Sequence, residues 1–276
     1  MVIDSHQHFW LYDPIRHDWI TSDMASIRRD FLPEDLAPIL STNGVDGCVA
    51  VQTDQTADET AFLLRLADAH EFIKGVVGWI DFKSETLVEQ LDYYTQYEKL
   101  KGFRHIVQAE AVDFLLDDTF IRGVQKLYSF GFTYDLLIYP TQLNAAIQFA
   151  QAVPDVPIVL DHLAKPYIRS RTLDTWQHEV TKLASCPNVY CKVSGLVTEA
   201  DWQHWRPSDF VAYLDVALEA FGPQRLLFGS DWPVCLVAAD YAQVLHVLTG
   251  YIATLSESEQ RQVMGQNALD FYKIDT

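Results

Sequence analysis

The chain has 276 residues, of which 49% are hydrophobic and 21% charged, and its formal net charge is −18 at pH 7. This composition is ordinary for a globular protein, and the acidic excess argues against nucleic acids and anionic membrane surfaces as partners. The apolar runs are far shorter than the roughly 20 residues of a membrane span, and the N-terminal residues lack the basic-then-apolar pattern of a secretory signal, so we expect neither feature.

Eight short apolar runs along the chain are candidate β-strands. In chain order they cover residues 2–9, 45–52, 73–82, 100–108, 132–139, 157–164, 188–196 and 225–233. Segments with helical periodicity separate them, for example residues 59–71 and 209–221. Many of the runs are almost continuously apolar, which is typical of parallel strands that are covered on both faces. They begin about 32 residues apart on average, the spacing at which eight βα units fill about 250 residues.

This repetition predicts a (β/α)8 TIM barrel that forms a single domain over residues 1–276. The competing fold is an open doubly wound sheet, but no glycine-rich phosphate-binding turn follows the first strand. Residues 10–31 are expected to form a long loop, and no linker of Pro, Gly or Ser divides the chain. The four cysteines include no CxxC pair and are expected to be buried thiols, which favours a cytoplasmic location.

Histidines and carboxylates occur at the expected C-terminal ends of strands, where TIM barrels hold their active sites. His6 and His8 share one face of the first strand, His162 lies at the end of the sixth, and Asp231 follows the eighth. Because polar groups in apolar strands are unfavourable unless satisfied, we expect these four side chains to converge. Two histidines and a carboxylate suit one divalent ion such as zinc, which makes hydroxide available at neutral pH.

Roles for individual residues follow from this arrangement. Asp231 is expected to accept a proton from the attacking water, and His162 to act as a further ligand or a base. We expect the basic residues in the strands to hold an anionic or oxyanionic group of the substrate. The residues expected to bind substrate are Arg104, His105, Lys165, Lys192, Ser194 and Trp232, the last as a pocket wall.

Five motifs in chain order resemble the amidohydrolase superfamily and, within it, the lactonase-like branch called amidohydrolase 2. They are IDSHQHFW at 3–10, KGFRHIVQ at 101–108, LDHLAKP at 160–166, KVSGL at 192–196 and FGSDWP at 228–233. The resemblance spans nearly the whole chain. It implies a carboxylic ester hydrolase of carbohydrate catabolism that opens sugar-acid lactones, such as L-fucono- or L-rhamnonolactone. It also implies that His6, His8, His162 and Asp231 are site residues.

The chain departs from the broader superfamily on its fourth and fifth strands. Many members carry a metal-bridging lysine or glutamate on strand four and a histidine on strand five, whereas this chain has FRH at 103–105 and YDLL at 134–137. The resemblance therefore implies either one zinc or manganese ion held by His6, His8 and Asp231, or a metal-independent enzyme. In the second case the two histidines would polarise the lactone carbonyl while Asp231 activates water.

Two other functions remain open from the sequence. A lactonase or decarboxylase for a carboxylate from aromatic degradation would need several arginines in its pocket, and Arg104 is the only arginine that we place within a strand. A barrel that merely binds carbohydrate would not need the His and Asp set. A small-molecule lactone is thus the expected partner, and the sequence leaves its identity and any homo-oligomer undecided.

Overall fold

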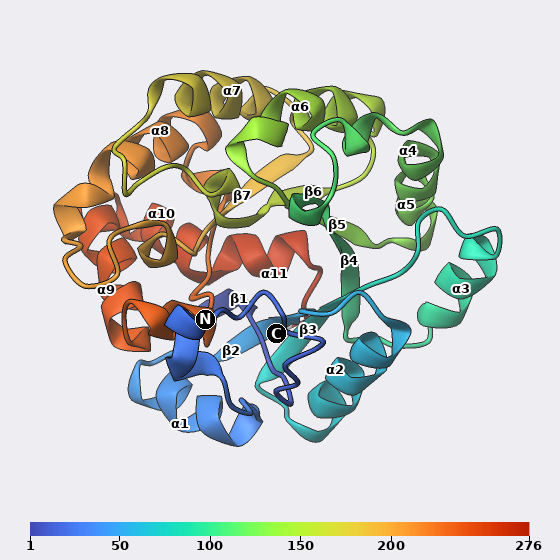
Figure 1. Ribbon diagram of the computed structural model, residues 1–276, viewed down its shortest axis with the longest axis horizontal. Coiled ribbons are helices and arrows are strands. Elements are labelled where there is room, and N and C mark those ends of the chain that lie inside the picture. Colours follow the sequence, from blue (N-terminus) through green and yellow to red (C-terminus); the bar gives the residue numbers. More distant parts are fainter. Residues whose placement is uncertain (276) are drawn as a thin grey trace.

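The computed structural model describes residues 1–275 and shows eight parallel strands that form a barrel surrounded by helices (Figure 1). Each strand pairs with the next one along the chain, which is the topology of a (β/α)8 barrel, so the predicted fold is confirmed. The strands are β1 (Ile3–Gln7), β2 (Gly47–Val51), β3 (Ile73–Gly78), β4 (Leu100–Ile106), β5 (Thr133–Leu137), β6 (Ile158–Leu160), β7 (Val189–Val193) and β8 (Leu226–Phe228).

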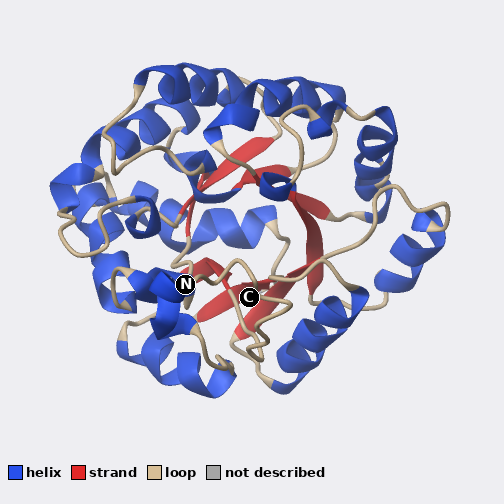
Figure 2. Ribbon diagram, viewed as in Figure 1, coloured by secondary structure: helices blue, strands red, loops and turns tan. Residues whose placement is uncertain are grey.

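Most of the helices form the outer layer around the strands, and one lies across the middle of the barrel in this view (Figure 2). They are α1 (Pro33–Thr42), α2 (Ala57–Ala69), α3 (Leu87–Tyr94), α4 (Asp118–Gln125), α5 (Leu127–Phe130), α6 (Leu143–Ala152), α7 (Asp174–Ala184), α8 (Val211–Phe221), α9 (Tyr241–Ile252), α10 (Glu257–Arg261) and α11 (Asn267–Phe271). Several have an N-cap residue whose side chain accepts a hydrogen bond from a backbone amide of the first turn, such as Thr56 at α2 and Asp240 at α9. No helix among the described residues is long and apolar enough to cross a membrane.

The barrel interior is apolar at the end where the strands begin. The residues that fill it, together with those after α10 that pack on them, include Ile3, Val49, Val51, Val77, Val159, Leu227, Leu269, Phe271 and Tyr272. α11 therefore closes this end, and a Cβ added at Gly265, just before α11, would overlap the carbonyl oxygen of Met1. Polar side chains occupy the opposite end of the interior.

Some strands end earlier than their apolar runs predict. β6 stops at Leu160 instead of continuing to residue 164, because His162, Leu163 and Ala164 all adopt left-handed φ angles. β8 likewise stops at Phe228, before Asp231, which has φ of 58°. The chain therefore turns at the two places where the expected site residues lie.

The segment between β1 and α1 is a long loop, as expected. Trp10 and Phe31 at its two ends exchange backbone hydrogen bonds with N···O distances of 3.0 and 2.9 Å. Within it the only helical part is a short 3-10 turn, Ser22–Ile27. The four cysteines are free and buried, in agreement with the prediction.

Candidate active site

The C-terminal end of the barrel brings together the four residues expected at its centre. The Nε2 atoms of His6 and His8 are 3.2 Å apart, and Asp231 Oδ1 lies 3.5 Å from His8 Nε2 and 3.8 Å from His162 Nε2. His6 is fully buried, and the other three residues are 3 to 4% exposed. Asp231 thus lies between the imidazoles of His8 and His162 at the C-terminal end of the barrel interior.

The turn after β6 explains how two consecutive residues reach the same cluster. Neighbouring residues of an extended strand point to opposite faces, yet Asp161 Oδ1 lies 3.2 Å from His6 Nδ1 and the His162 ring lies 4.3 Å from the His6 ring. The left-handed conformation begins at His162 and continues to Lys165, without a glycine. Such residues cost roughly 1–2 kcal/mol each, so the strain is retained because surrounding contacts hold it.

Two buried cations and two buried carboxylates lie next to the histidines, on the side of the barrel interior. Arg104 donates a 3.0 Å hydrogen bond to Asp161, and Lys192 Nζ lies 3.1 Å from the same carboxylate. Lys192 also donates to Asp135, which accepts a further hydrogen bond from the Tyr272 hydroxyl. Two cations therefore meet two anions, all of them buried, which is the arrangement that makes buried charges tolerable.

This charge set orients His6. Asp161 and Lys192 both lie next to its Nδ1, at 3.2 and 3.1 Å, and the Arg104 guanidinium is 3.5 Å from its Nε2. A second group of hydrogen bonds fixes Arg104, because the Gln52 side-chain oxygen accepts from its Nε and Nη2 at 3.2 and 3.0 Å. His6 is consequently held from both ring nitrogens.

The protonation states of the four central residues follow from burial. Burial lowers the pKa of His6 and His8 and brings the pKa of His162 to about 4, so all three imidazoles are neutral at pH 7. Burial alone would raise the pKa of Asp231, but His162, His8 and Lys165 hold it below its usual value. The cluster is one ionised carboxylate among neutral imidazoles.

The donor set fits one divalent metal ion. Two nitrogen ligands of a tetrahedral zinc ion lie about 3.3 Å apart, and the Nε2 atoms of His6 and His8 are 3.2 Å apart. The Val51 carbonyl oxygen lies 2.7 Å from His8 Nδ1, so that nitrogen carries the proton and Nε2 keeps its lone pair. Asp231 completes the set, with ligand atoms within 4.8 Å of one another.

A separate polar network joins the edges of the barrel between β1 and β8. Asp4 accepts hydrogen bonds from the Ser230 amide at 2.9 Å, the Ser230 hydroxyl at 2.6 Å and the Tyr241 hydroxyl at 3.0 Å. Next to it the Asp231 amide donates to the His6 carbonyl at 2.9 Å. Asp4 therefore fixes the residue directly before Asp231.

Three of the expected substrate-binding residues lie beside the cluster. Arg104 contacts His6, as described, and the Ser194 hydroxyl is 2.8 Å from His162 Nδ1. Lys165 lies at the end of the left-handed turn, and its side chain is 22% exposed. These positions are compatible with a role in substrate binding or in the support of His162.

The other three have different surroundings. His105 follows Arg104 on β4 and therefore points away from the interior, where it stacks on Phe114 and is 3.0 Å from a Glu110 carboxylate oxygen. Lys192 has no exposed side-chain surface and supports Asp161 instead of facing a ligand. Trp232 is 1% exposed and packs on Phe9 and Phe31. None of these three is placed as a substrate contact.

Asp161 and Asp135 are the site residues to which the sequence interpretation gave no role. Each is a carboxylate in or directly after an apolar strand, and Lys192 is an isolated cation in another. Isolated opposite charges in buried strands are a signal for a buried ion pair. That signal indicates pairing, but it does not show which strands bring the charges together.

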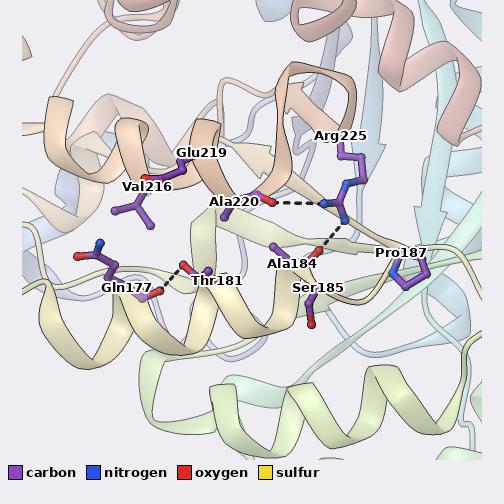
Figure 3. Close-up of a pocket in the computed structure, with 9 residues that line it drawn as sticks. All are labelled: Gln177, Thr181, Ala184, Ser185, Pro187, Val216, Glu219, Ala220 and Arg225. Atoms are coloured by element: carbon purple, nitrogen blue, oxygen red, sulfur yellow. Dashed lines mark hydrogen bonds between the residues drawn. The ribbon is translucent and has the colours of Figure 1, made fainter.

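A 740 Å³ cavity lies away from this cluster, between α7 and α8 (Figure 3). Its most polar lining residue, Arg225, is occupied, since it donates to the carbonyl oxygens of Ala184, Val189 and Ala220. The cavity contains none of the clustered histidines and carboxylates, so its size does not indicate the reaction site.

Known proteins resemble this chain over its full length. The profile of the amidohydrolase family matches residues 3–274. L-Fucono-1,5-lactonase of Burkholderia multivorans is 41% identical over 99% of this chain and 96% of its own length. L-Fucono-1,5-lactonase of Burkholderia ambifaria is 35% identical with the same coverage.

A solved structure agrees with these relatives. The crystal structure of an amidohydrolase from Burkholderia multivorans with bound zinc superimposes with a TM-score of 0.96, at 41% identity and with complete coverage of both chains. The shared fold is therefore accompanied by substantial sequence identity along the entire barrel.

Proposed function

This chain belongs to the amidohydrolase family, and we propose that it is a lactonase that opens a sugar-acid lactone, such as L-fuconolactone, to the free acid. One observation carries the proposal. An ionised Asp231 lies between His8 and His162 at the C-terminal end of the barrel, in a chain 41% identical to an L-fucono-1,5-lactonase. We further propose a cytoplasmic role in carbohydrate catabolism.

Asp231 is the general base of the proposed reaction. Its lowered pKa keeps it ionised at neutral pH, so it can accept a proton from a water molecule that attacks the lactone carbonyl. The C–O ring bond then breaks, and the proton held by Asp231 passes to the departing ring oxygen. Water is thereby added across one ester bond, and the carboxylate is regenerated.

Neutral His6 stabilises the charge that develops on the carbonyl oxygen. His8 has a fixed tautomer with its proton on Nδ1, so its Nε2 accepts and cannot itself donate to an oxyanion. His6 Nε2 can donate when Lys192 donates to its Nδ1, and the Arg104 guanidinium lies 3.5 Å from the same nitrogen. Preorganised donors of this kind are the largest source of stabilisation in acyl transfer.

His6, His8 and Asp231 would hold a divalent ion, and we propose zinc because the related structure contains it. When bound, such an ion polarises carbonyl groups and lowers the pKa of water. Asp161 would then be the acceptor for His6 Nδ1–H, which leaves the lone pair of Nε2 toward the ion. The same residues thus suit the enzyme with a metal ion, when the His6 proton is on Nδ1, and without one, when the proton is on Nε2.

The cluster disfavours the aromatic-derived carboxylate as substrate. Arg104 is the only arginine that contacts the four central residues among the described side chains, and its charge is already balanced by Asp161. A substrate with several carboxylates would require additional free cations. A neutral polyol lactone does not.

The proposal is tested by Asp231→Asn in a proton-release assay on a panel of aldonolactones, with and without prior dialysis against a chelator. Removal of a general base is expected to lower kcat by about 10²–10⁴-fold and to leave KM nearly unchanged. Asp201→Asn, which changes an exposed carboxylate, is the matched control and should retain full activity. A wild-type protein that opens no aldonolactone faster than the spontaneous reaction would refute the proposal.

A further inference from the structure

Lys165 and Glu199 form an ion pair at the edge of the site with an unusual geometry. Lys165 ends the left-handed turn after β6, and Glu199 ends the 3-10 turn Val197–Glu199 that follows β7. Their nearest charged atoms, Nζ and Oε1, are 3.6 Å apart, beyond the range of a good hydrogen bond. Their side chains are 22 and 24% exposed, so both are largely withdrawn from water.

Backbone contacts hold this pair beside the reacting groups. The Lys165 amide donates to the His162 carbonyl at 2.7 Å, and the Arg169 amide donates to the Glu199 carbonyl at 3.0 Å. A Cβ at Gly195, four residues before Glu199, would lie only 2.8 Å from the His162 ring. The two loops are thus packed against each other and against His162.

A hollow of 570 Å³ lies next to Glu199. Its lining includes Tyr167, Ser170, Thr198, Glu199 and Trp202. The indole of Trp202 and the exposed ring of Tyr167 offer apolar surfaces, while the hydroxyl and carboxylate groups offer polar ones. A few polar groups among aromatic rings are the usual composition of a small-molecule site.

The chemistry of the pair matches hydroxyl groups. A carboxylate only accepts hydrogen bonds and an ammonium only donates them, whereas a hydroxyl does both. Lys165 Nζ and Glu199 Oε1 are 3.6 Å apart, which is too far for a strong hydrogen bond between them. A substrate hydroxyl placed near both charges would accept a hydrogen bond from the Lys165 ammonium and donate one to the Glu199 carboxylate. Both charged groups are only partly exposed to water.

We propose that Lys165 and Glu199 form a subsite that binds the hydroxyl groups of the polyol part of the substrate. The inference rests on the proposed lactonase function and adds a residue, Glu199, that sets preference for hydroxylated lactones. It assigns these residues to binding, while Asp231 performs the proton transfer. The hollow next to Glu199 accommodates the part of the sugar that extends beyond the lactone ring.

The experiment compares Glu199→Gln and Lys165→Met with the wild type on two probes, L-fucono-1,4-lactone and γ-butyrolactone, which has no hydroxyl group. Glu199→Gln is expected to raise KM for the hydroxylated lactone about 10-fold, the usual effect of a lost hydrogen bond to a charged group, with little change in kcat. Its kinetic constants for γ-butyrolactone should not change. Lys165→Met should raise the same KM, and only Glu199→Gln carries the γ-butyrolactone comparison, because Lys165 also lowers the pKa of Asp231. Glu219→Gln, in the remote cavity between α7 and α8, is the matched control.

Two outcomes overturn the subsite. One is an unchanged KM for the hydroxylated lactone in both variants, and the other is an equal loss for both probes in Glu199→Gln, which a purely structural role of the pair would produce. A binding measurement that needs no turnover separates this inference from the proposed function. Calorimetry with galactitol should show binding to the wild type and about 10-fold weaker binding to Glu199→Gln. If no lactone is opened but this difference is observed, only the lactonase proposal fails.

Discussion

Asp161 and Asp4 are both completely buried in the same barrel, but their partners differ in kind. Asp161 lies beside the cationic groups of Arg104 and Lys192, whereas Asp4 accepts only from neutral amide and hydroxyl groups. Burial would raise the pKa of either carboxyl, but Lys192, His6 and Arg104 hold the pKa of Asp161 well below its usual range. The neutral donors of Asp4 do not compensate for burial, and its pKa rises to about 6.

The difference shows that cationic partners can keep a buried carboxylate charged, but one such partner does not always offset burial, since Asp135 beside Lys192 also has a pKa raised to about 6. Asp161 stays charged at neutral pH and can orient His6 there. Asp4 fixes the position of Ser230 and hence of Asp231 with groups that carry no charge. The following changes test this distinction.

The largest expected effect comes from Lys192→Met, which removes the cation shared by Asp135 and Asp161. Asp135 would lose the cation that pairs with it and Asp161 would keep only Arg104 of its two cationic partners, and breaking a buried pair costs about 3–5 kcal/mol of stability. Urea unfolding measures this change. Lys165→Met, which breaks a partly exposed pair, should cost no more than ~1 kcal/mol. Equal effects of both changes would show that the interior charges do not depend on Lys192.

The second effect is the pH dependence that Asp4 contributes. Its pKa rises from 3.8 to about 6 on folding, so folding favours the protonated carboxyl. Its contribution to stability is complete below pH 3.8 and is lost as the pH rises through about 6, by ~3 kcal/mol in total. Wild type should therefore lose stability relative to Asp4→Asn between pH 4 and 7, measured by urea unfolding of chelator-treated protein.

Asp161→Asn tests the opposite direction of pKa shift, again by urea unfolding at different pH values. The folded-state pKa of Asp161 is lowered, so its contribution is present above pH 3.8 and is lost only as the pH falls through the lower folded value. Because Asp161 also raises the pKa of Asp135, which is about 6, the stability difference between this variant and wild type should stay constant above pH 7, where Asp135 is ionised in both proteins. A slope in that range as steep as that of Asp4→Asn at lower pH would contradict the comparison.

The smallest effect is expected from Tyr241→Phe, which removes one neutral donor from Asp4 while Ser230 still provides two. A single lost hydrogen bond of this kind costs about 1 kcal/mol, measured by urea unfolding at pH 7. Tyr251→Phe removes an exposed hydrogen bond to Asp215 and is the matched control. A loss near that of Lys192→Met would mean that Asp4 depends on Tyr241 more than the geometry indicates.

Much of the barrel could be predicted from the sequence because strand and helix periodicities are local properties. Each of the eight predicted apolar runs contains one observed strand, β1 to β8. The spacing of His6 and His8 places both at the end of β1. The left-handed turn at His162 was not predictable in this way, since no glycine marks it. Alternation along β6 places Asp161 on the interior face with Val159, but it does not predict that His162 also reaches the interior cluster.

The sequence by itself determined the βα repeat, the apolar strands and the presence of histidines and carboxylates near strand ends. Only the tertiary structure decided that Lys192 meets Asp135 and Asp161 and that Asp4 meets Ser230. The physical reason is that periodicity depends on neighbouring residues along the chain, whereas these pairings depend on barrel closure and strand register. Register joins residues far apart in sequence, and here it selects which buried charges are neutralised.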